Sequence, residues 1–172
     1  LPRVDVCLVA MSGCSLFSTF DLKGAYHQVP MDPNDANKTA FICRQGMFRF
    51  RYMPFGLCNS AATFQRLMDL VMSGLVFEAC LVYLDDVIIL SRTIDEHFER
   101  LEAVLQRLVN AGLKLKPSKC SLLQESVEFL GHVLSKDGVA TDPKKTTAVT
   151  EWPVPRTVKE IRSFLELCGY YR

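Results

Sequence analysis

Residues 82–88 of the chain read VYLDDVI, which places two adjacent carboxylates between two short apolar runs. Apolar strands that flank a polar tip are typical of a β-hairpin, so we expect strands at 81–83 and 87–90, with Asp85 and Asp86 at the tip. Removing two like charges from water is costly unless a cation neutralises them. Taken alone, the pair fits two interpretations equally well: turn residues in contact with water, or ligands of a cation.

A third carboxylate, Asp21, follows the apolar run FSTF at 17–20, near the end of a strand predicted at 16–22. Three carboxylates on neighbouring strand ends could hold two Mg²⁺ ions, because Mg²⁺ prefers oxygen ligands and is bound by carboxylates together with substrate phosphates. Two such ions, about 3.5–4 Å apart, activate a 3′-hydroxyl and stabilise a leaving pyrophosphate. The alternative is that Asp21 is only a turn former at a strand end.

The spacing of apolar and turn-forming residues predicts a mixture of strands and helices without regular β-α-β alternation. Such a mixture favours an α+β fold with an antiparallel sheet and helices packed on one face. The other expected elements are hairpin strands at 39–43 and 47–52, a helix from Asn59 or Ser60 to Gly74, a helix from a Thr93–Glu96 capping box to Gly112, strands at 113–115 and 127–134, and tail helices that begin at Asp142 and Thr157.

The composition is that of one globular domain, with 172 residues of which 49% are hydrophobic and 23% charged. The net charge of +1 excludes a strongly basic nucleic-acid module, but not a nucleic-acid enzyme whose positive groove coexists with acidic catalytic residues. The seven cysteines form no C-x-x-C pair and are expected to be reduced, which indicates an intracellular protein.

Other sequence signals are absent. No apolar run has the length of about 20 residues that crosses a bilayer, and no secretory signal is visible, so we expect no membrane partner. His27 and His97 have no Cys or His partners at metal spacing, so we predict no zinc site. Because the first residue is Leu1, we expect the chain to begin partway through a longer product.

Five ordered blocks resemble the reverse transcriptases of gypsy-type LTR retrotransposons. The blocks are FSTFDLKGAY at 17–26, MPFGLCNSAATFQ at 53–65, YLDD at 83–86, FLGH at 129–132, and an ending with WP at 152–153, RSFL at 162–165 and YYR at 170–172. A lone Tyr-x-Asp-Asp box would be weak, but the five blocks cover nearly the whole chain in order. The resemblance implies a polymerase palm with partial fingers over residues 1–140 and the start of the thumb over 141–172.

The resemblance also implies roles for individual residues. Asp21, Asp85 and Asp86 match the carboxylates that bind two Mg²⁺ ions, which Mn²⁺ can replace, and Lys119 matches the lysine that protonates the leaving pyrophosphate. The simpler alternative is that Lys119 is a loop lysine in contact with water. The match further places Tyr26 under the sugar of the incoming nucleotide. It places Pro54, Phe55 and Gly56 around the nucleotide and template. The residues that it places at the nucleic acid are Tyr83, Gln65, Phe129, Leu130, Gly131 and His132.

Some matched residues have simpler alternatives, and two positions depart from the family pattern. Tyr26 could be a core aromatic and His132 an ordinary loop residue. Phe55 stands where retroviral enzymes carry Gln, and Glu166 stands where the family usually has Gly. The basic finger residues that grip the triphosphate are expected to lie before the first residue of this chain.

The expected function is therefore RNA- and DNA-templated DNA synthesis by a fragment of a retrotransposon Pol polyprotein. The resemblance implies as partners a primed RNA or DNA template, deoxynucleoside triphosphates, and the protease, RNase H and integrase regions of the parent. It also implies a cytoplasmic location in virus-like particles. Two alternatives remain: a non-catalytic retroelement relic that only binds nucleic acid, and an unrelated two-metal hydrolase, which would not explain the blocks at 53–65 and 129–132.

Overall fold

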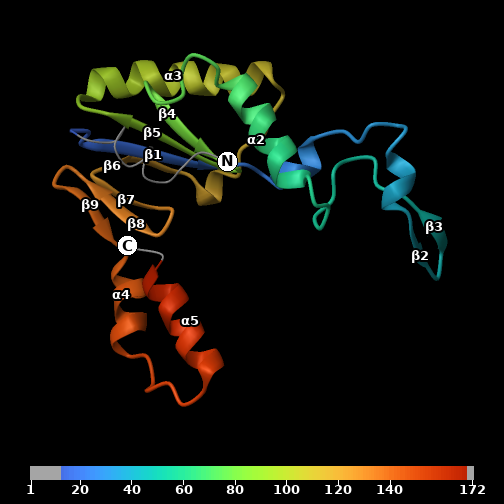
Figure 1. Ribbon diagram of the computed structural model, residues 1–172. Coiled ribbons are helices and arrows are strands. Elements are labelled where there is room, and N and C mark those ends of the chain that lie inside the picture. The colour runs from blue at the N-terminus through green and yellow to red at the C-terminus, as the bar shows by residue number, and fades with distance from the viewer. Residues whose placement is uncertain (1–12, 170–172) are drawn as a thin grey trace.

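A four-stranded antiparallel sheet lies at the centre of the molecule. The computed structural model describes residues 13–169, apart from the side chains of residues 144, 145 and 148. The strand order is β4 (Cys80–Tyr83), β5 (Asp86–Ser91), β1 (Leu16–Asp21) and β6 (Ser121–Gln124), so β5 and β1 are the two inner strands (Figure 1). The predicted α+β fold with an antiparallel sheet is confirmed.

Helices cover one face of this sheet, as predicted. They are α2 (Ser60–Val71) and α3 (Ile94–Asn110), which lie together above the strands in Figure 1. Alternate strand residues such as Phe20, Val87 and Ile89 join a buried cluster with residues of both helices. Full burial of a large apolar side chain contributes about 1.5–3 kcal/mol, so this layer is a main source of stability.

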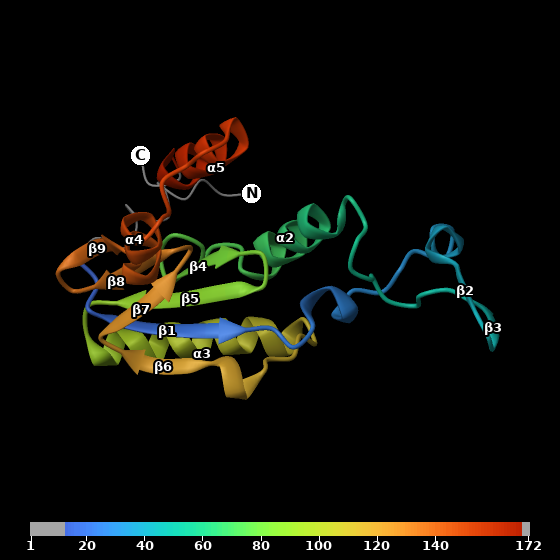
Figure 2. The same ribbon diagram turned by 90° about the horizontal axis from the view of Figure 1, so that it is seen from below.

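A second, three-stranded sheet covers the opposite face. It consists of β7 (Ser126–Phe129), β8 (His132–Ser135) and β9 (Gly138–Thr141), and Figure 2 shows β7 crossing the strands of the central sheet. The intervening strand residues point to this side and pack against it. This second buried cluster contains Phe17, Ile88 and Leu90 from the central sheet, with Val127, Phe129 and Leu134 from the three-stranded one. The central strands are therefore buried on both faces.

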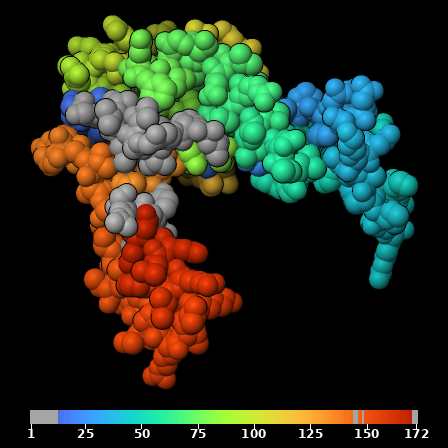
Figure 3. Space-filling view, viewed as in Figure 1, coloured from blue at the N-terminus to red at the C-terminus, as the bar shows by residue number. Residues whose placement is uncertain are grey.

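Two parts project from this body, which we define as the two sheets with α2 and α3. The arm, residues 25–55, contains η1 (Ala25–Gln28), η2 (Ala36–Thr39) and the hairpin of β2 (Phe41–Cys43) and β3 (Gly46–Phe48). The tail contains α4 (Pro143–Thr150) and α5 (Val158–Gly169), which contact each other. Figure 3 shows the arm and the tail as separate projections of the body. No helix among the described residues has the length and apolarity needed to cross a membrane.

Several predicted boundaries were wrong, for local reasons. Residues 113–115 form no strand and make only a single bridge, between Leu22 and Leu115. The strand predicted at 127–134 is divided by Leu130 and Gly131, which both have positive φ, the requirement of a tight type I′ hairpin turn. Strand β6 was not predicted, and the second strand of the arm hairpin ends at Phe48. The predicted YYR ending lies outside the described residues.

The tip between β4 and β5 contains one unfavourable backbone conformation. Tyr83 pairs with Asp86, so the loop has only two residues, and Leu84 at its first position has a φ of 56°. This position corresponds to the glycine site of a type II′ turn. A left-handed conformation costs a residue with a side chain roughly 1–2 kcal/mol, so surrounding contacts must hold Leu84 in place.

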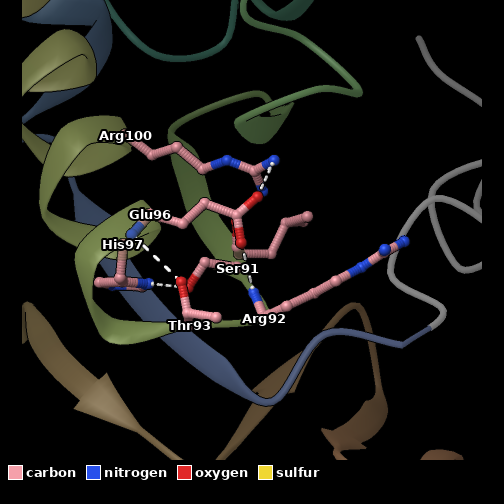
Figure 4. A network of polar contacts seen from close by, with 7 residues as sticks. Ser91, Arg92, Thr93, Glu96, His97 and Arg100 are labelled. Carbon is pink, nitrogen blue, oxygen red and sulfur yellow. Dashed lines mark hydrogen bonds and ion pairs between the residues drawn. The ribbon is translucent and has the colours of Figure 1, made fainter.

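A buried histidine connects α3 with the central sheet. The His97 ring is fully buried, and its Nε2 atom lies 2.7 Å from Ser18 Oγ. Its Nδ1 atom lies 2.8 Å from Ser91 Oγ (Figure 4). The helix begins at the predicted capping residue, since Thr93 Oγ1 accepts the Glu96 N–H at 3.3 Å. The Glu96 carboxylate accepts the Arg92 N–H at 2.7 Å and pairs with Arg100 at 2.7 Å.

We expect His97 to make the protein less stable in acid. Burial, and after it the charge of Arg100, lowers the pKa of His97 from 6.5, while Glu96 opposes the shift. Below about pH 6.5 the unfolded chain therefore binds more protons at this site, and the free energy of unfolding falls by up to about 1.4 kcal/mol per pH unit. Urea unfolding at several pH values should show this slope, and it should be smaller in His97→Gln. Equal slopes in both proteins would contradict the assignment.

Candidate active site

Strand pairing brings the three predicted carboxylates to one end of the central sheet. Asp21 is the last residue of β1 and lies directly opposite Asp86, the first residue of β5. Directly opposite residues of antiparallel strands have Cα atoms about 4.5–5.5 Å apart. Asp85 occupies the two-residue loop next to Asp86. Residues far apart in the sequence thus form one acidic group.

Lys119 lies beside this acidic group. It ends the short helix η3 (Pro117–Lys119), and its Nζ lies 2.7 Å from Asp21 Oδ2. The hydrogen bond with Asp21, and then the charge of Asp21, raises the pKa of Lys119. The backbone fixes this approach, because the Lys116 N–H donates to the Asp21 carbonyl at 2.9 Å.

The carboxylate of Asp86 is repelled by those of Asp85 and Asp21. Partial removal from water raises the pKa of Asp86, the charges of Asp85 and Asp21 raise it further, and Lys119 opposes them. Among residues 13–169, no three carboxylate, imidazole or thiol groups already stand in a geometry that would hold a metal ion by themselves. The donor set nevertheless fits a hard cation, since all the ligands are carboxylate oxygens and substrate phosphates supply further oxygens.

Two predicted nucleotide-contacting residues lie next to the carboxylates. Tyr26 and Phe55 line a cavity of about 410 Å³ together with Asp21, Asp85 and Lys119. The rings of Tyr26 and Phe55 have centroids 5.3 Å apart. Pro54 and Gly56 line a neighbouring cavity that shares Phe55. The structure therefore brings Tyr26 and Phe55 to the acidic group and places Pro54 and Gly56 beside them.

The turn between β7 and β8 borders the acidic group from the other side. Phe129 and Leu130 line a cavity of about 330 Å³ with Asp21, Asp86 and Lys119. Phe129 is also a core residue, because it is buried between the two sheets. Gly131 and His132 follow in the turn and at the start of β8, and His132 Nδ1 lies 3.0 Å from the Leu130 carbonyl oxygen.

Gln65, which the resemblance places at the nucleic acid, is buried in this structure. Only 4% of its surface is exposed, and its amide contacts the tip that carries Asp85. A glutamine in an amphipathic helix gives no sign of this long-range contact. Tyr83 is half-buried and packs against the cluster between the two sheets. Its side chain therefore contributes to the packing under the tip.

Gln28 is a residue that the sequence interpretation missed. Its side-chain nitrogen donates to the Lys23 carbonyl at 2.9 Å and the Lys114 carbonyl at 3.0 Å, and its oxygen accepts the Lys114 N–H at 2.7 Å. These bonds join the end of β1 to the segment that leads to Lys119. Its partner at Lys114 is distant in the sequence, so no local pattern could have revealed the role.

Comparison with known proteins supports the resemblance seen in the motifs. A family model described as reverse transcriptase (RNA-dependent DNA polymerase) matches residues 4–134. All 172 residues match the Retrovirus-related Pol polyproteins of Drosophila melanogaster from transposon 297, at 42% identity, and from transposon gypsy, at 39%. The chain spans 16% and 17% of the length of these two relatives.

Solved structures show the same fold. The foamy viral protease-reverse transcriptase in complex with double-stranded DNA matches all of this chain over 30% of its own length, with a TM-score of 0.90 and 25% identity. The same viral protein in complex with an RNA/DNA hybrid matches 96% of this chain over 23% of its own, with a TM-score of 0.81 and 27% identity. Sequence, fold and family model agree, and the chain belongs to the reverse transcriptases, the RNA-dependent DNA polymerases.

Proposed function

We propose that this chain provides the catalytic centre for RNA- and DNA-templated DNA synthesis in a retrotransposon Pol polyprotein. The observation that carries the proposal is the pairing of Asp21 with Asp86, next to Asp85 and Lys119. An unrelated two-metal hydrolase is excluded by the family match. The remaining alternative is a relic that binds nucleic acid without catalysis.

Membership of the family implies use of a divalent metal. We propose that Asp21, Asp85 and Asp86 would hold two Mg²⁺ ions, or Mn²⁺ in their place, through carboxylate oxygens. When bound, such ions stabilise charge on the reacting phosphate and activate the attacking 3′-hydroxyl. Partial burial raises the pKa of Asp86, and repulsion by Asp85 and Asp21 raises it further. A cation would relieve this repulsion, which supports the assignment.

Lys119 is proposed as the proton donor to the leaving pyrophosphate. A lysine amino group is protonated at neutral pH, and the hydrogen bond and charge of Asp21 raise the pKa of Lys119 further. Its side chain is 57% exposed, so the amino group is accessible from the cavity that it lines with Tyr26. A cation in this place would also counter the charge of the triphosphate.

The partners follow from the same proposal. Deoxynucleoside triphosphates would occupy the cavity lined by Tyr26 and Phe55, bordered by Pro54 and Gly56. The β7–β8 turn, with Phe129, Leu130, Gly131 and His132, would face the primer, and Tyr83 would lie beneath it. The foamy viral relatives were solved with double-stranded DNA and with an RNA/DNA hybrid, which supports a primed template as the substrate.

The setting of the chain is also proposed. Residues 1–140 would be the palm with partial fingers, and residues 141–172 the start of the thumb. Protease, RNase H and integrase regions would accompany it in the parent polyprotein, within cytoplasmic virus-like particles. The Pol polyproteins among its relatives, several times longer than this chain, support this arrangement.

Primer extension tests the proposed function. A protein that carries this chain together with the proposed finger and thumb segments of the parent polyprotein is mixed with a primed RNA or DNA template, deoxynucleoside triphosphates and Mg²⁺ or Mn²⁺, and extended products are separated by length. We expect extension on both templates that stops when a chelator removes the metal. Binding of the primed template without any extension would support the relic instead.

Tyr26→Ala should increase the use of ribonucleotides relative to deoxyribonucleotides. The Tyr26 ring lines the proposed nucleotide cavity and is held by Phe55 and by an edge contact with Phe64 at 5.7 Å. Removing the ring would remove the clash with a 2′-hydroxyl, the group that distinguishes the two sugars. Single-nucleotide insertion measures the ratio, and Tyr26→Phe, which keeps the ring, should leave it unchanged. An unchanged ratio in Tyr26→Ala would make Tyr26 a packing residue only.

A further inference from the structure

The tip that carries Asp85 needs a contact that holds its backbone in place. Leu84 has a φ of 56°, a conformation that leucine rarely adopts, and the loop has only one other residue. A change at Leu84 would rotate the following peptide units, and with them the directions of Asp85 and Asp86. The directions of the Asp85 and Asp86 side chains therefore depend on the contact that fixes the Leu84 backbone.

Gln65 supplies this contact from α2. Its Oε1 accepts the Leu84 N–H at 2.8 Å, and its Nε2 lies 3.4 Å from the Val82 carbonyl oxygen. One side chain thus contacts the last part of β4 and the first residue of the loop. The side chain is buried, and it is flanked in α2 by Phe64 and Met68, which are fully buried in the core. A well-anchored helix therefore holds the tip.

Asp69 determines which way the Gln65 amide points. An amide must direct its oxygen at Leu84, because only the oxygen accepts a hydrogen bond. Asp69 Oδ1 accepts from Gln65 Nε2 at 2.9 Å, a charge-assisted bond that is shorter than the contact with Val82. Asp69 lies four positions after Gln65 and hence on the same side of the helix.

We propose that Gln65, oriented by Asp69, is a positioning residue that holds Leu84 in its left-handed conformation and thereby sets the directions of Asp85 and Asp86. Neither Gln65 nor Asp69 touches the reacting atoms. The proposal rests on the proposed function for its catalytic consequence, but the contact itself can be measured without catalysis.

The first test measures the contact directly. NMR should show the Leu84 amide proton of the wild-type protein with the weak temperature dependence of a hydrogen-bonded group. In Gln65→Met, which has similar length but no amide, this proton should shift upfield and acquire the temperature dependence of a free amide. An unchanged Leu84 resonance would overturn the proposal, whether or not the protein is a polymerase.

The second test measures the consequence for the acidic group. The affinity for Mn²⁺, measured by electron paramagnetic resonance, should fall about tenfold in Gln65→Met. The kcat for primer extension should fall about ten- to a hundredfold, which is roughly the effect of losing one positioning hydrogen bond. KM for the primed template should change less than about twofold. Loss of thermal stability with unchanged kcat and Mn²⁺ affinity would leave Gln65 a packing residue and overturn the proposal.

Asp69 provides a matched pair of variants on the helix surface. Asp69→Ala removes the acceptor and should lower kcat and Mn²⁺ affinity in the same direction as Gln65→Met, whereas Asp69→Asn keeps an acceptor oxygen and should stay near wild type. Leu70→Ala changes an exposed neighbour and serves as the control. Equal activity in Asp69→Ala and Asp69→Asn would overturn the proposal, in which Asp69 orients the Gln65 amide. Because Asp69 is exposed, this pair carries the test even if Gln65→Met does not fold.

If the wild-type protein neither binds Mn²⁺ nor extends primers, the proposed function fails and only the NMR result applies to Gln65. If the wild-type protein is active but Gln65→Met matches it in kcat and in the Leu84 resonance, the positioning proposal alone fails.

Discussion

Asp85→Asn should lower the rate of primer extension about a thousandfold or more. Asp85 lies in the tip beside the Asp21–Asp86 pair, and an amide at this position would remove one negative ligand from the proposed metal site. Loss of one group that stabilises transition-state charge typically costs about 10²–10³-fold, and a weakened metal site adds to that loss. Single-turnover extension at saturating Mg²⁺ measures the effect on the chemical step.

Thermal unfolding separates a lost ligand from a lost fold. The Asp85 charge raises the pKa of Asp86, so the two carboxylates repel each other and Asp85→Asn should unfold at the same or a higher temperature. Glu102→Gln, an exposed change on α3, is the control for removing one charge and should extend primers normally. Near-normal extension by Asp85→Asn would refute the assignment of Asp85 as a metal ligand.

Phe64→Ala should lower the free energy of unfolding by about 3–5 kcal/mol, the usual cost of removing a large aromatic side chain from a core. Phe64 is fully buried between α2 and the central sheet and contacts the ring of Tyr26. Domains of this size are stable by about 5–15 kcal/mol, so the loss is a large fraction of the total. Urea unfolding followed by circular dichroism gives the difference directly.

Leu70→Ala is the matched control for this experiment. Leu70 lies on the same helix but is 70% exposed, so its truncation should change the free energy of unfolding by less than about 0.5 kcal/mol. A loss below about 1 kcal/mol in Phe64→Ala would mean that α2 is not packed on the sheet as described.

The hairpin of β4 and β5 could be predicted from sequence because its pattern is local. Apolar residues on both sides of Asp85 and Asp86 predicted β4 and β5, and the structure confirms both. The capping residue Thr93 likewise marked the start of α3. Pairing of Asp21 with Asp86 depends on the register of distant strands, which a single sequence does not contain. The residues alone therefore suggested only that these carboxylates could meet, and the family resemblance implied that they do.

Elements that depend on distant partners were predicted less well. Residues 113–115 have the apolar composition of a strand, but they form one bridge and are held by the Gln28 side chain. Residues 127–134 were predicted from their apolar composition as one strand, because that composition does not mark Leu130 as a turn residue ahead of Gly131. The contact of Gln65 with the tip was missed for a related reason: helical periodicity assigns a face, but it does not reveal that a polar side chain contacts a backbone amide on a neighbouring hairpin.

The position of β1 and β5 inside the central sheet has a consequence for how the molecule opens. Each strand is hydrogen-bonded on both sides and covered on both faces. Their amide protons should therefore exchange with deuterium only on global unfolding, whereas amides of the arm hairpin β2–β3, with its exposed Ile42 and Met47, should exchange through local opening of low free energy. The strands that present Asp21 and Asp86 thus form the part of the protein that opens last. In the proposed function, movements that admit a template or release a product must then come from the segments around them.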